Sequence, residues 1–393
     1  GREKGLVNFR VFFREEYGKS IVKGSKLFDR PIGDIKRLAI KQSEWKKWPL
    51  NSPLAYAISH EMGAWAPPTE PVIFYLNGEK LGLYYIVPHL GEKQLEQMLP
   101  KGEYQYYRWR GAQHPADREF FLQEFWMKIN GDQGLEITEE YAEQSFDLEN
   151  LSNQIFSYIY NGTGDFCQGI AAKSTSEGAK MFWLSWDMDH SFIDVQREIY
   201  DKRDINRERW EQPPYLTDFF TQETKESNHY CPRVRLFRRL VNDDPFFRDK
   251  VKERFMEIMN HLVSDEKISQ LLYETWQDLT GAKYSFRDEY ISVLSDFFRH
   301  RKQFIIQQME KSLPVAPVKT CNVDSDIFPI SVDGYTKTKR YEGYYFPGSI
   351  VSLETDVNSN FKYWLIDGNI HDSHKLDLPV SLDQECQIKA VFH

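Results

Sequence analysis

The sequence lacks the features that mark several large classes of protein. Its 393 residues contain only four cysteines, and no two of them have the CxxC spacing of a metal site. No run reaches the roughly 18 apolar residues that a membrane helix needs. Lysine and arginine total 50 against 59 acidic residues, and no strongly basic block occurs. The sequence therefore predicts neither a cysteine-ligated metal site, nor a membrane span, nor a nucleic-acid partner.

Common nucleotide-binding loops and targeting segments are also missing. No GxGxxG occurs, and GKS at residues 18–20 lacks the earlier glycine of a Walker A loop. The start is not a signal peptide, and Gly1 followed by Arg-Glu-Lys is typical of an internal stretch, so we expect that upstream sequence was removed. Cys321 and Cys386 either pair in an oxidising compartment or stay free in a core, and the compartment is left open.

Length and composition predict a globular protein of two or three domains. Hydrophobic residues make up 41 % and charged residues 28 %, which is ordinary for a chain with a real core. Aromatic residues reach 15 %, which fits aromatic cores or surfaces that face sugars. LPVAPVK at 313–319 is typical of a linker. We therefore expect a main part over 1–312, a linker over 313–319 and an all-β accessory domain over 320–393.

The first part of the chain contains extended segments, one helix and one hairpin. Ser52 is the expected N-cap of the helix, Pro53 suits its first turn, and Gly63 suits its end. Asn77-Gly78 lies between two runs that are rich in β-forming residues. This dipeptide predicts a type I′ hairpin, because that turn needs positive φ at both central residues.

The following part alternates helices with a second hairpin. Amphipathic patterns predict helices over 117–129 and directly after Asp147, which is the expected N-cap. GIAAK (169–173) and AKMFWLSW (179–186) are predicted to pair as two strands. From 232 to 312 the pattern is mainly helical. The main part is therefore predicted to combine an N-terminal mixed sheet with a helical half.

Two carboxylates interrupt an apolar stretch directly after the second predicted strand of that hairpin. In WLSWDMDHSF (183–192), an extended strand would project Asp187 and Asp189 from one face, about 6–7 Å apart. Burying unpaired carboxylates is costly, and a bound cation such as Mg²⁺, which prefers oxygen ligands, would resolve this conflict. The alternatives are that the carboxylates cap the next helix or pair with an arginine such as Arg197.

A third aspartate precedes the same hairpin. Asp165 ends the glycine-rich loop NGTGD, 22 residues before Asp187. Protein kinases have this order, in which a catalytic-loop aspartate accepts the proton of the substrate hydroxyl and a second aspartate binds metal. A hairpin between them folds back, so both carboxylates are predicted to face one cleft. The alternative for Asp165 is a turn residue after a helix.

Together these segments resemble the spore-coat protein H (CotH) kinase-like family over most of residues 8–312. The most specific parts are the NGEKLGLY hairpin and WDMD. The resemblance rests on GKS (18–20), LF (27–28), PLAYAISHEMG (53–63), VIFYLNGEKLGLY (72–84), FDLENL (146–151), GD (164–165), WDMD (186–189) and FRRLVNDDPFFRDKVKERF (237–255). It implies an α+β, atypical protein-kinase-like two-lobed fold with an N-lobe over about 1–110 and a helical C-lobe over about 111–312.

The resemblance also implies a function. Members are expected to be secreted or surface-exposed bacterial kinases that use ATP and Mg²⁺ and transfer the γ-phosphoryl group to protein Ser/Thr. On this resemblance Asp165 is the base, Asp187 the principal metal ligand and Asp189 a second or supporting ligand. Lys19 matches the family's nucleotide-binding lysine, and Lys41 is the reserve candidate. The expected partner is a protein substrate or a surface or coat protein.

Departures from the family pattern keep other functions open. Ile170 stands where members commonly have an asparagine, Val87-Pro88-His89 where an acidic residue is usual, and Asn51-Ser52 where an arginine is common. Loss of such groups would weaken electrostatic catalysis and favours a pseudokinase that acts in binding or surface assembly. The aromatic content and the C-terminal β segments, which resemble modules of bacterial extracellular proteins, instead fit a secreted carbohydrate-binding or adhesive protein.

Overall fold

The computed structural model describes most of the chain. The predicted helix over 117–129 and the candidate base Asp165 lie outside the described residues. The described residues are 7–28, 32–42, 50–99, 102–109, 138–164, 166, 169–199, 207–220, 232–277, 287–313, 317–357, 359–381 and 386–393.

The chain divides into two compact units. The first comprises Gly1–Arg248 and Asp265–Ile305, and the second comprises Asp249–Ser264 and Ile306–His393. Both contain helical residues and antiparallel strand pairs, so the predicted α+β class is confirmed. The second unit takes in helical residues that precede the predicted linker at 313–319, a division that the sequence did not indicate.

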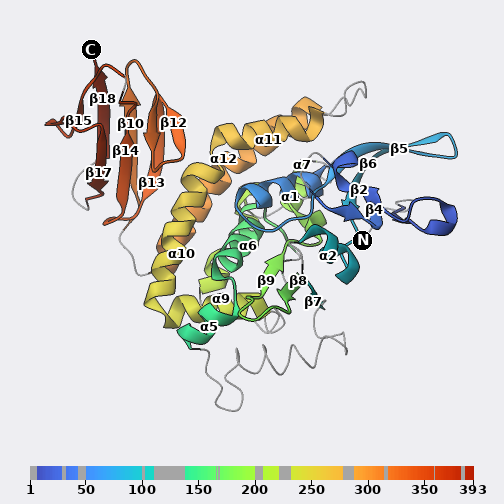
Figure 1. Cartoon of the computed structure of the whole chain (residues 1–393). Coiled ribbons are helices and arrows are strands. Elements are labelled where there is room, and N and C mark those ends of the chain that lie inside the picture. The colour runs from blue at the N-terminus through green and yellow to red at the C-terminus, as the bar shows by residue number, and fades with distance from the viewer. Residues whose placement is uncertain are drawn as a thin grey trace. The chain divides into compact units, whose positions relative to one another are not determined.

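A four-stranded antiparallel sheet with the order β1-β4-β6-β5 forms the N-terminal part of the first unit (Figure 1). Asn77 and Gly78 join β5 to β6 with φ angles of 51° and 84°, which confirms the predicted hairpin. One face of the sheet buries Leu38, Ile40, Tyr84 and Ile86. The strands of this part are β1 (Phe9–Phe12), β2 (Val22–Lys23), β3 (Asp34–Ile35), β4 (Arg37–Lys41), β5 (Glu70–Leu76) and β6 (Glu79–Pro88).

Helix α1 (Asn51–Glu61) connects β4 to β5. Its N-cap is Leu50, which makes no side-chain capping bond, while Ser52 lies buried within the first turn. The predicted capping role of Ser52 is therefore wrong, because this end of the helix is turned into the interior. Gly63 follows the helix with a φ angle of 76°, as predicted for its C-terminal end.

Helix α6 (Leu148–Tyr160) lies against the strand β9 of a three-stranded sheet (Figure 1). Asp147 caps the helix as predicted, since its side chain accepts the backbone N–H of Asn150 at 2.9 Å. The predicted hairpin is confirmed, and a further strand pairs with its other edge. The three strands are β7 (Tyr104–Trp109), β8 (Gly169–Ser174) and β9 (Phe182–Leu184).

Helices dominate the rest of the first unit and continue into the second. The helical pattern predicted over 232–312 is confirmed by α9 to α12. Within the part of the chain that the structure describes, no helix combines the length and apolar character required to cross a membrane. The remaining helices are α2 (Glu92–Met98), α5 (Glu139–Ser145), α7 (Ile193–Ile199), α8 (Thr217–Phe220), α9 (Pro232–Asp243), α10 (Pro245–Glu257), α11 (Asp265–Gln277) and α12 (Arg287–Ser312).

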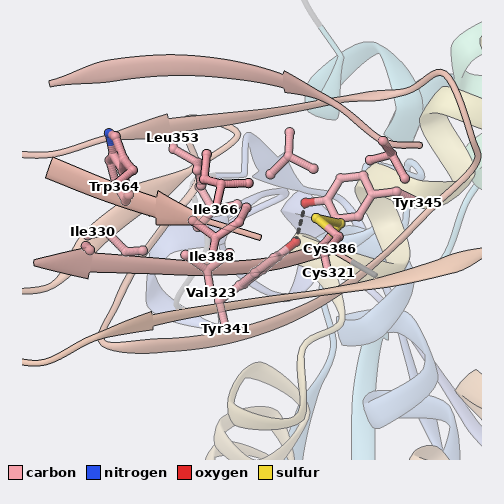
Figure 2. Packing of buried hydrophobic residues seen from close by; sticks show 14 of the residues in the cluster. Cys321, Val323, Ile330, Tyr341, Tyr345, Leu353, Trp364, Ile366, Cys386 and Ile388 are labelled. Atoms are coloured by element: carbon pink, nitrogen blue, oxygen red, sulfur yellow. Dashed lines mark hydrogen bonds between the residues drawn. A yellow bond between two sulfur atoms is a disulfide. The ribbon is translucent and has the colours of Figure 1, made fainter. Parts of the chain in front are cut away.

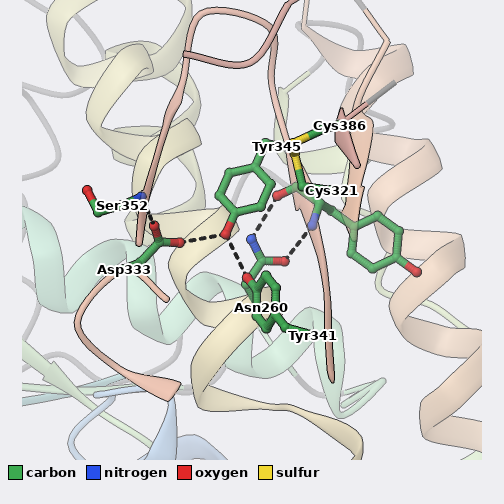
Figure 3. The surroundings of a disulfide bond; sticks show 8 residues. Asn260, Cys321, Asp333, Tyr341, Tyr345, Ser352 and Cys386 are labelled. Carbon is green, nitrogen blue, oxygen red and sulfur yellow. Dashed lines mark hydrogen bonds between the residues drawn. A yellow bond between two sulfur atoms is a disulfide. The ribbon is translucent and has the colours of Figure 1, made fainter. Parts of the chain in front are cut away.

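Two packed sheets form the β-sandwich of the second unit, with the orders β13-β10-β18-β15-β16 and β12-β11-β14-β17. Their facing side chains form one core, in which Trp364 is fully buried (Figure 2). Cys321 and Cys386 are directly paired in β10 and β18 and form a disulfide (Figure 3). The strands are β10 (Lys319–Ser325), β11 (Ile330–Val332), β12 (Thr336–Thr338), β13 (Arg340–Tyr345), β14 (Ile350–Glu354), β15 (Phe361–Ile366), β16 (Asn369–His371), β17 (Lys375–Pro379) and β18 (Cys386–Phe392).

Side chains of the short π-helix η8 (Ile258–Leu262) attach this helical segment to the sandwich. Asn260 donates to the carbonyl of Tyr344 at 2.8 Å and accepts its N–H at 2.9 Å, so it pairs with the edge strand β13 (Figure 3). The ring nitrogen Nε2 of His261 lies 3.0 Å from Oδ2 of Asp333. These contacts explain why residues before the predicted linker belong to the second unit.

Candidate functional site

Two predicted site residues meet in the first unit. The Nζ atom of Lys41, at the end of β4, lies 3.4 Å from Oδ1 of Asp187. It also lies 5.5 Å from the ring centroid of Trp186. The two side chains are only 22 % and 15 % exposed, so the ion pair is partly shielded from water. The fold thus joins residues that are 146 positions apart in the sequence.

Strand β4 directs Lys41 toward this site. Side chains alternate along a strand, so Lys41 shares a face with Ala39, which packs with Tyr85 and Val87. Tyr85 is also the cross-strand neighbour of Lys41 in β6. Burial acts to lower the pKa of Lys41, but Tyr85, Asp187 and Asp189 outweigh it, and the pKa is raised. The amine therefore remains a cation at neutral pH.

The WDMD segment leaves the strand before it reaches the carboxylates. Strand β9 ends at Leu184, Asp187 has a left-handed conformation with φ of 55°, and Met188–His190 form a 3-10 helix, η5. The prediction that Asp187 and Asp189 project from one strand face is therefore wrong. Aspartate tolerates the left-handed region better than most residues do, which permits this sharp change of direction.

The simpler explanations for Asp187 are not supported. Asp187 occupies the N-cap position of η5, but its side chain makes no capping bond there. Arg197, the arginine considered as its partner, instead pairs with the fully buried Asp194 at 3.2 Å. The carboxylate of Asp187 is directed to Lys41.

Two buried phenol groups fix consecutive peptide units before η5. The hydroxyl of Tyr56, in α1, accepts the N–H of Asp187 at 3.1 Å. The hydroxyl of Tyr158, in α6, accepts the N–H of Trp186 at 3.1 Å and donates to its carbonyl at 2.9 Å. Burial raises the pKa of Tyr56 well above its usual value, so its hydroxyl stays neutral. Two helices therefore maintain the unusual backbone conformation that orients Asp187.

Helix α6 presents a polar strip to the backbone that leads to Asp187. Asn150, Gln154 and Tyr158 are spaced four residues apart and lie on one helix face. Asn150 Oδ1 accepts the N–H of Trp183 at 2.6 Å. Gln154 donates to the Trp183 carbonyl at 3.2 Å and accepts from the hydroxyl of Ser185 at 3.2 Å. All three side chains are buried, and each bonds to the backbone of Trp183 or Trp186.

This polar strip was missed by the sequence reasoning, which used the apolar residues of the same helix to predict its buried face. The signal that would have revealed it is the pattern N-x-x-x-Q-x-x-x-Y from Asn150 to Tyr158. Three amide or hydroxyl groups at this spacing, among the apolar residues of a helix that is expected to be buried, indicate a buried polar face, because each must find a partner.

The loop after α6 lies beside η5. Gly162 has a φ of 56°, and a Cβ atom there would be 1.8 Å from Nε2 of Gln212, which donates to the Gly162 carbonyl at 2.6 Å. The N–H of Gly164 points to the carbonyl of His190 at 3.4 Å. Asp165, which follows in the sequence, lies outside the described residues. Its role as base stays a prediction.

Other predicted positions fall away from the ion pair. Lys19 is exposed in the segment that precedes β2, so the structure brings Lys41 rather than Lys19 to Asp187. Ile170 is fully buried in β8 and offers no ligand atom. Pro88 pairs with Leu38 at the far end of β6, three residues beyond the neighbour of Lys41.

The donor set is chemically suited to a metal-bound phosphate. Asp187 and Asp189 supply carboxylate oxygens, which Mg²⁺ prefers, and Lys41 supplies a cation. Among the residues that the structure describes, no group of three or more His, Cys, Asp or Glu side chains is placed to hold a metal. Asp165, the predicted base, is not among those residues.

A comparison with protein-family models settles the family. The model of the CotH kinase protein matches residues 47–305, more than half of the chain. The chain belongs to the CotH kinase family. The matched range includes Asp165, Asp187 and Asp189 but begins after Lys41, so the place of Lys41 in this CotH kinase family member rests on the structure. A search of curated protein sequences finds no significant match.

Proposed function

We propose that this protein is a Mg²⁺-dependent kinase that transfers the γ-phosphoryl group of ATP to Ser or Thr hydroxyls of a protein substrate. The observation that carries the proposal is the ion pair between Lys41 and Asp187. In protein kinases a strand lysine binds the nucleotide phosphates and an aspartate after the second hairpin binds metal. The family assignment supports the same chemistry.

The order of elements supports a two-lobed kinase fold. A lysine ends the strand β4, helix α1 follows, and then come the β5–β6 hairpin, helix α6, the Asp165 loop and the β8–β9 hairpin that leads to Asp187. Protein kinases place their lysine strand, αC helix, catalytic loop and metal-binding aspartate in this sequence. We therefore assign the β1–β6 sheet and α1 to the small lobe and the elements of the first unit from α6 onward to the large lobe.

Each site residue has a distinct proposed role. Asp165 accepts the proton of the attacking hydroxyl, whose oxygen bonds to the γ-phosphorus while the bond to the ADP oxygen breaks and ADP keeps the electron pair. Lys41 binds the phosphates, and Asp187 with Asp189 would hold Mg²⁺. When bound, Mg²⁺ neutralises negative charge on the phosphates. We favour Lys41 over Lys19 because only the former contacts Asp187.

Titration calorimetry of ATP with and without Mg²⁺ tests this proposal. We expect Mg²⁺-dependent binding that Asp187→Ala removes and that Lys41→Met weakens about tenfold or more, as expected when a charge-assisted contact is lost. Lys19→Met is the matched control and should bind like the unchanged protein. Absence of ATP binding under every condition would refute the kinase proposal. Equal losses in both lysine variants would refute the preference for Lys41.

A pseudokinase is the second candidate function. The observation that favours it is the fully buried Ile170, which stands where family members have an asparagine. Such a protein would act in binding or surface assembly. Incubation with γ-labelled ATP and a panel of Ser/Thr-containing proteins separates the two candidates. Mg²⁺-dependent binding with no label transferred, and no autophosphorylation, would favour the pseudokinase.

We further propose that the protein acts outside a bacterial cell or on its surface, on a protein substrate or a coat protein. The Cys321–Cys386 disulfide supports this location, because such bonds persist mainly in oxidising compartments. Cell fractionation with mass spectrometry of unreduced peptides tests it. Recovery of the protein only in the cytosol with both thiols reduced would overturn it. Binding of the sandwich to a glycan array would instead favour the carbohydrate-binding alternative.

A further inference from the structure

We propose that Arg233 is a positioning residue that couples the loop after Asp165 to the Trp186–Asp187 segment through Tyr158. The functional meaning of this coupling rests on the proposed kinase function, in which Asp165 and Asp187 act together. The coupling itself rests on contacts among Phe166, Arg233, Tyr158 and Trp186, all of which the structure describes.

Arg233 contacts the loop on one side. It belongs to α9, only 1 % of it is exposed, and its guanidinium donates to the carbonyl of Phe166. Phe166 directly follows Asp165 in the sequence. The Phe166 ring also packs against that of Phe219, with centroids 5.3 Å apart. The residue after the candidate base is therefore fixed through both its backbone and its side chain.

On its other side, Arg233 contacts Tyr158, the residue that bonds to the backbone of Trp186. Its guanidinium carbon lies 4.2 Å from the ring centroid of Tyr158, a distance at which the cation is attracted to the ring face. The hydroxyl of the same tyrosine bonds both the N–H and the carbonyl of Trp186. A displacement of Arg233 therefore changes the support of the ring that positions the residue before Asp187.

The chemistry of arginine suits this double contact. A planar guanidinium can stack on an aromatic ring and donate in its own plane at the same time, whereas a lysine ammonium is a compact point charge. A buried cation is costly unless its contacts are well formed, so the arrangement has little freedom. Substitution of a residue that orients a metal ligand without itself binding the metal typically lowers metal affinity or activity about 10–100-fold.

Hydrogen–deuterium exchange of the protein without ligand tests the coupling directly. We expect Arg233→Met to accelerate exchange of the Trp186 and Asp187 amides at least tenfold. The Trp186 N–H donates to Tyr158, whose ring loses its contact with Arg233, and a shift of Trp186 also displaces the adjoining Asp187 N–H, which donates to Tyr56. Arg233→Lys serves where the methionine variant folds poorly. Arg248→Met is the matched control, since Arg248 donates to the carbonyls of Val241 and Asn242 at 2.7 and 2.6 Å, at the C-terminal end of α9.

Titration of ATP and Mg²⁺ supplies the functional readout. We expect Arg233→Met and Tyr158→Phe each to weaken Mg²⁺-dependent ATP binding 10–100-fold. Their double variant should lose much less than the product of the single losses, because both changes break one connection. Tyr158→Phe keeps the ring under Arg233 and removes only the hydroxyl.

The outcomes separate the two proposals. Exchange and affinity in the Arg233 variants that equal those of Arg248→Met would overturn the coupling. Multiplicative losses in the double variant would also overturn it. If exchange at Trp186 and Asp187 responds to Arg233 but the unchanged protein binds no ATP, the coupling stands and the proposed function fails.

Discussion

The site region of the first unit and the β-sandwich of the second are stabilised by different kinds of contact. Around α6, buried amide and hydroxyl side chains bond to the backbone of Trp183 and Trp186, which leads to Asp187. In the sandwich, alternating apolar side chains from two sheets pack around Trp364, and a disulfide joins β10 to β18. Hydrogen bonds stabilise one particular backbone path, whereas the stabilisation from apolar burial depends on the buried area and only weakly on direction. The polar framework of the first unit therefore lies where a functional side chain must be oriented.

Positive φ angles separate the two regions in the same way. In the sandwich, Asp333 and Asp367 have φ of 53° and 46° and are each followed by glycine, as in ordinary hairpin turns. In the first unit, Asp187 and Phe192 have φ of 55° and 57° but no glycine follows either. Their conformations depend on distant partners, including Tyr56, which accepts the N–H of Asp187. Strain of this kind is typical of functional sites.

The largest expected effect is in the sandwich. Trp364→Ala should lower the free energy of unfolding of the second unit by about 3–5 kcal/mol, because it leaves a large cavity in the apolar core and removes the bond from the indole N–H to the Ser373 carbonyl. Chemical denaturation measures this. ATP affinity below the transition should stay within about twofold, since every proposed site residue lies in the first unit. A large loss of affinity would break the comparison.

A polar change in the first unit should have a smaller effect on stability, but it should also lower ATP affinity. Gln154→Leu keeps the side-chain size but leaves the Trp183 carbonyl and the Ser185 hydroxyl without this partner. We expect a loss of about 2–4 kcal/mol in unfolding free energy, from the cost of unsatisfied buried groups. ATP affinity should fall as well. Leu151→Ala, a buried apolar change in the same helix, is the control that should affect stability alone.

A single hydroxyl of the site sharpens the comparison further. Tyr56→Phe removes the acceptor of the Asp187 N–H and keeps the ring. We expect Mg²⁺-dependent ATP affinity to fall about 3–10-fold, the equivalent of one ordinary hydrogen bond, with unfolding free energy reduced by about 1 kcal/mol. Calorimetry and denaturation measure the two quantities. A change in stability without a change in affinity would mean that the hydroxyl does not position Asp187.

The smallest effect concerns pH, where both regions should behave alike. The pKa of Lys41 is raised, and burial raises the pKa of Tyr56 in the first unit and of Tyr345 in the second. Groups with a raised folded pKa contribute stability that is complete below the unfolded value, near 10 for tyrosine, and lost as the pH rises beyond it. Unfolding free energy should therefore not respond to these groups between about pH 7 and 9 and should fall above about pH 10. Loss of unfolding free energy at a lower pH in one region than in the other would show that the two regions respond differently to pH.

Local sequence signals predicted the elements whose causes are local. The Asn77-Gly78 turn, the Asp147 cap and the alternating strands of the C-terminal segment each depend on neighbouring residues. The proximity of Lys41 to Asp187 depends on the fold of the intervening chain, and the sequence reasoning ranked Lys19 first. The predicted strand face of Asp187 and Asp189 failed for the same reason, since a distant tyrosine hydroxyl fixes the turn there.

The sequence by itself determined the α+β class, the family and the three aspartates from which the chemistry is proposed, because these are carried by residue type, order and short-range pattern. The tertiary structure decided which lysine contacts Asp187 and which buried side chains position Asp187. It also decided that residues 249–264 belong with the sandwich. Hydrogen bonds between residues far apart in the chain require a few tenths of an ångström of placement, which only the packing of whole elements supplies.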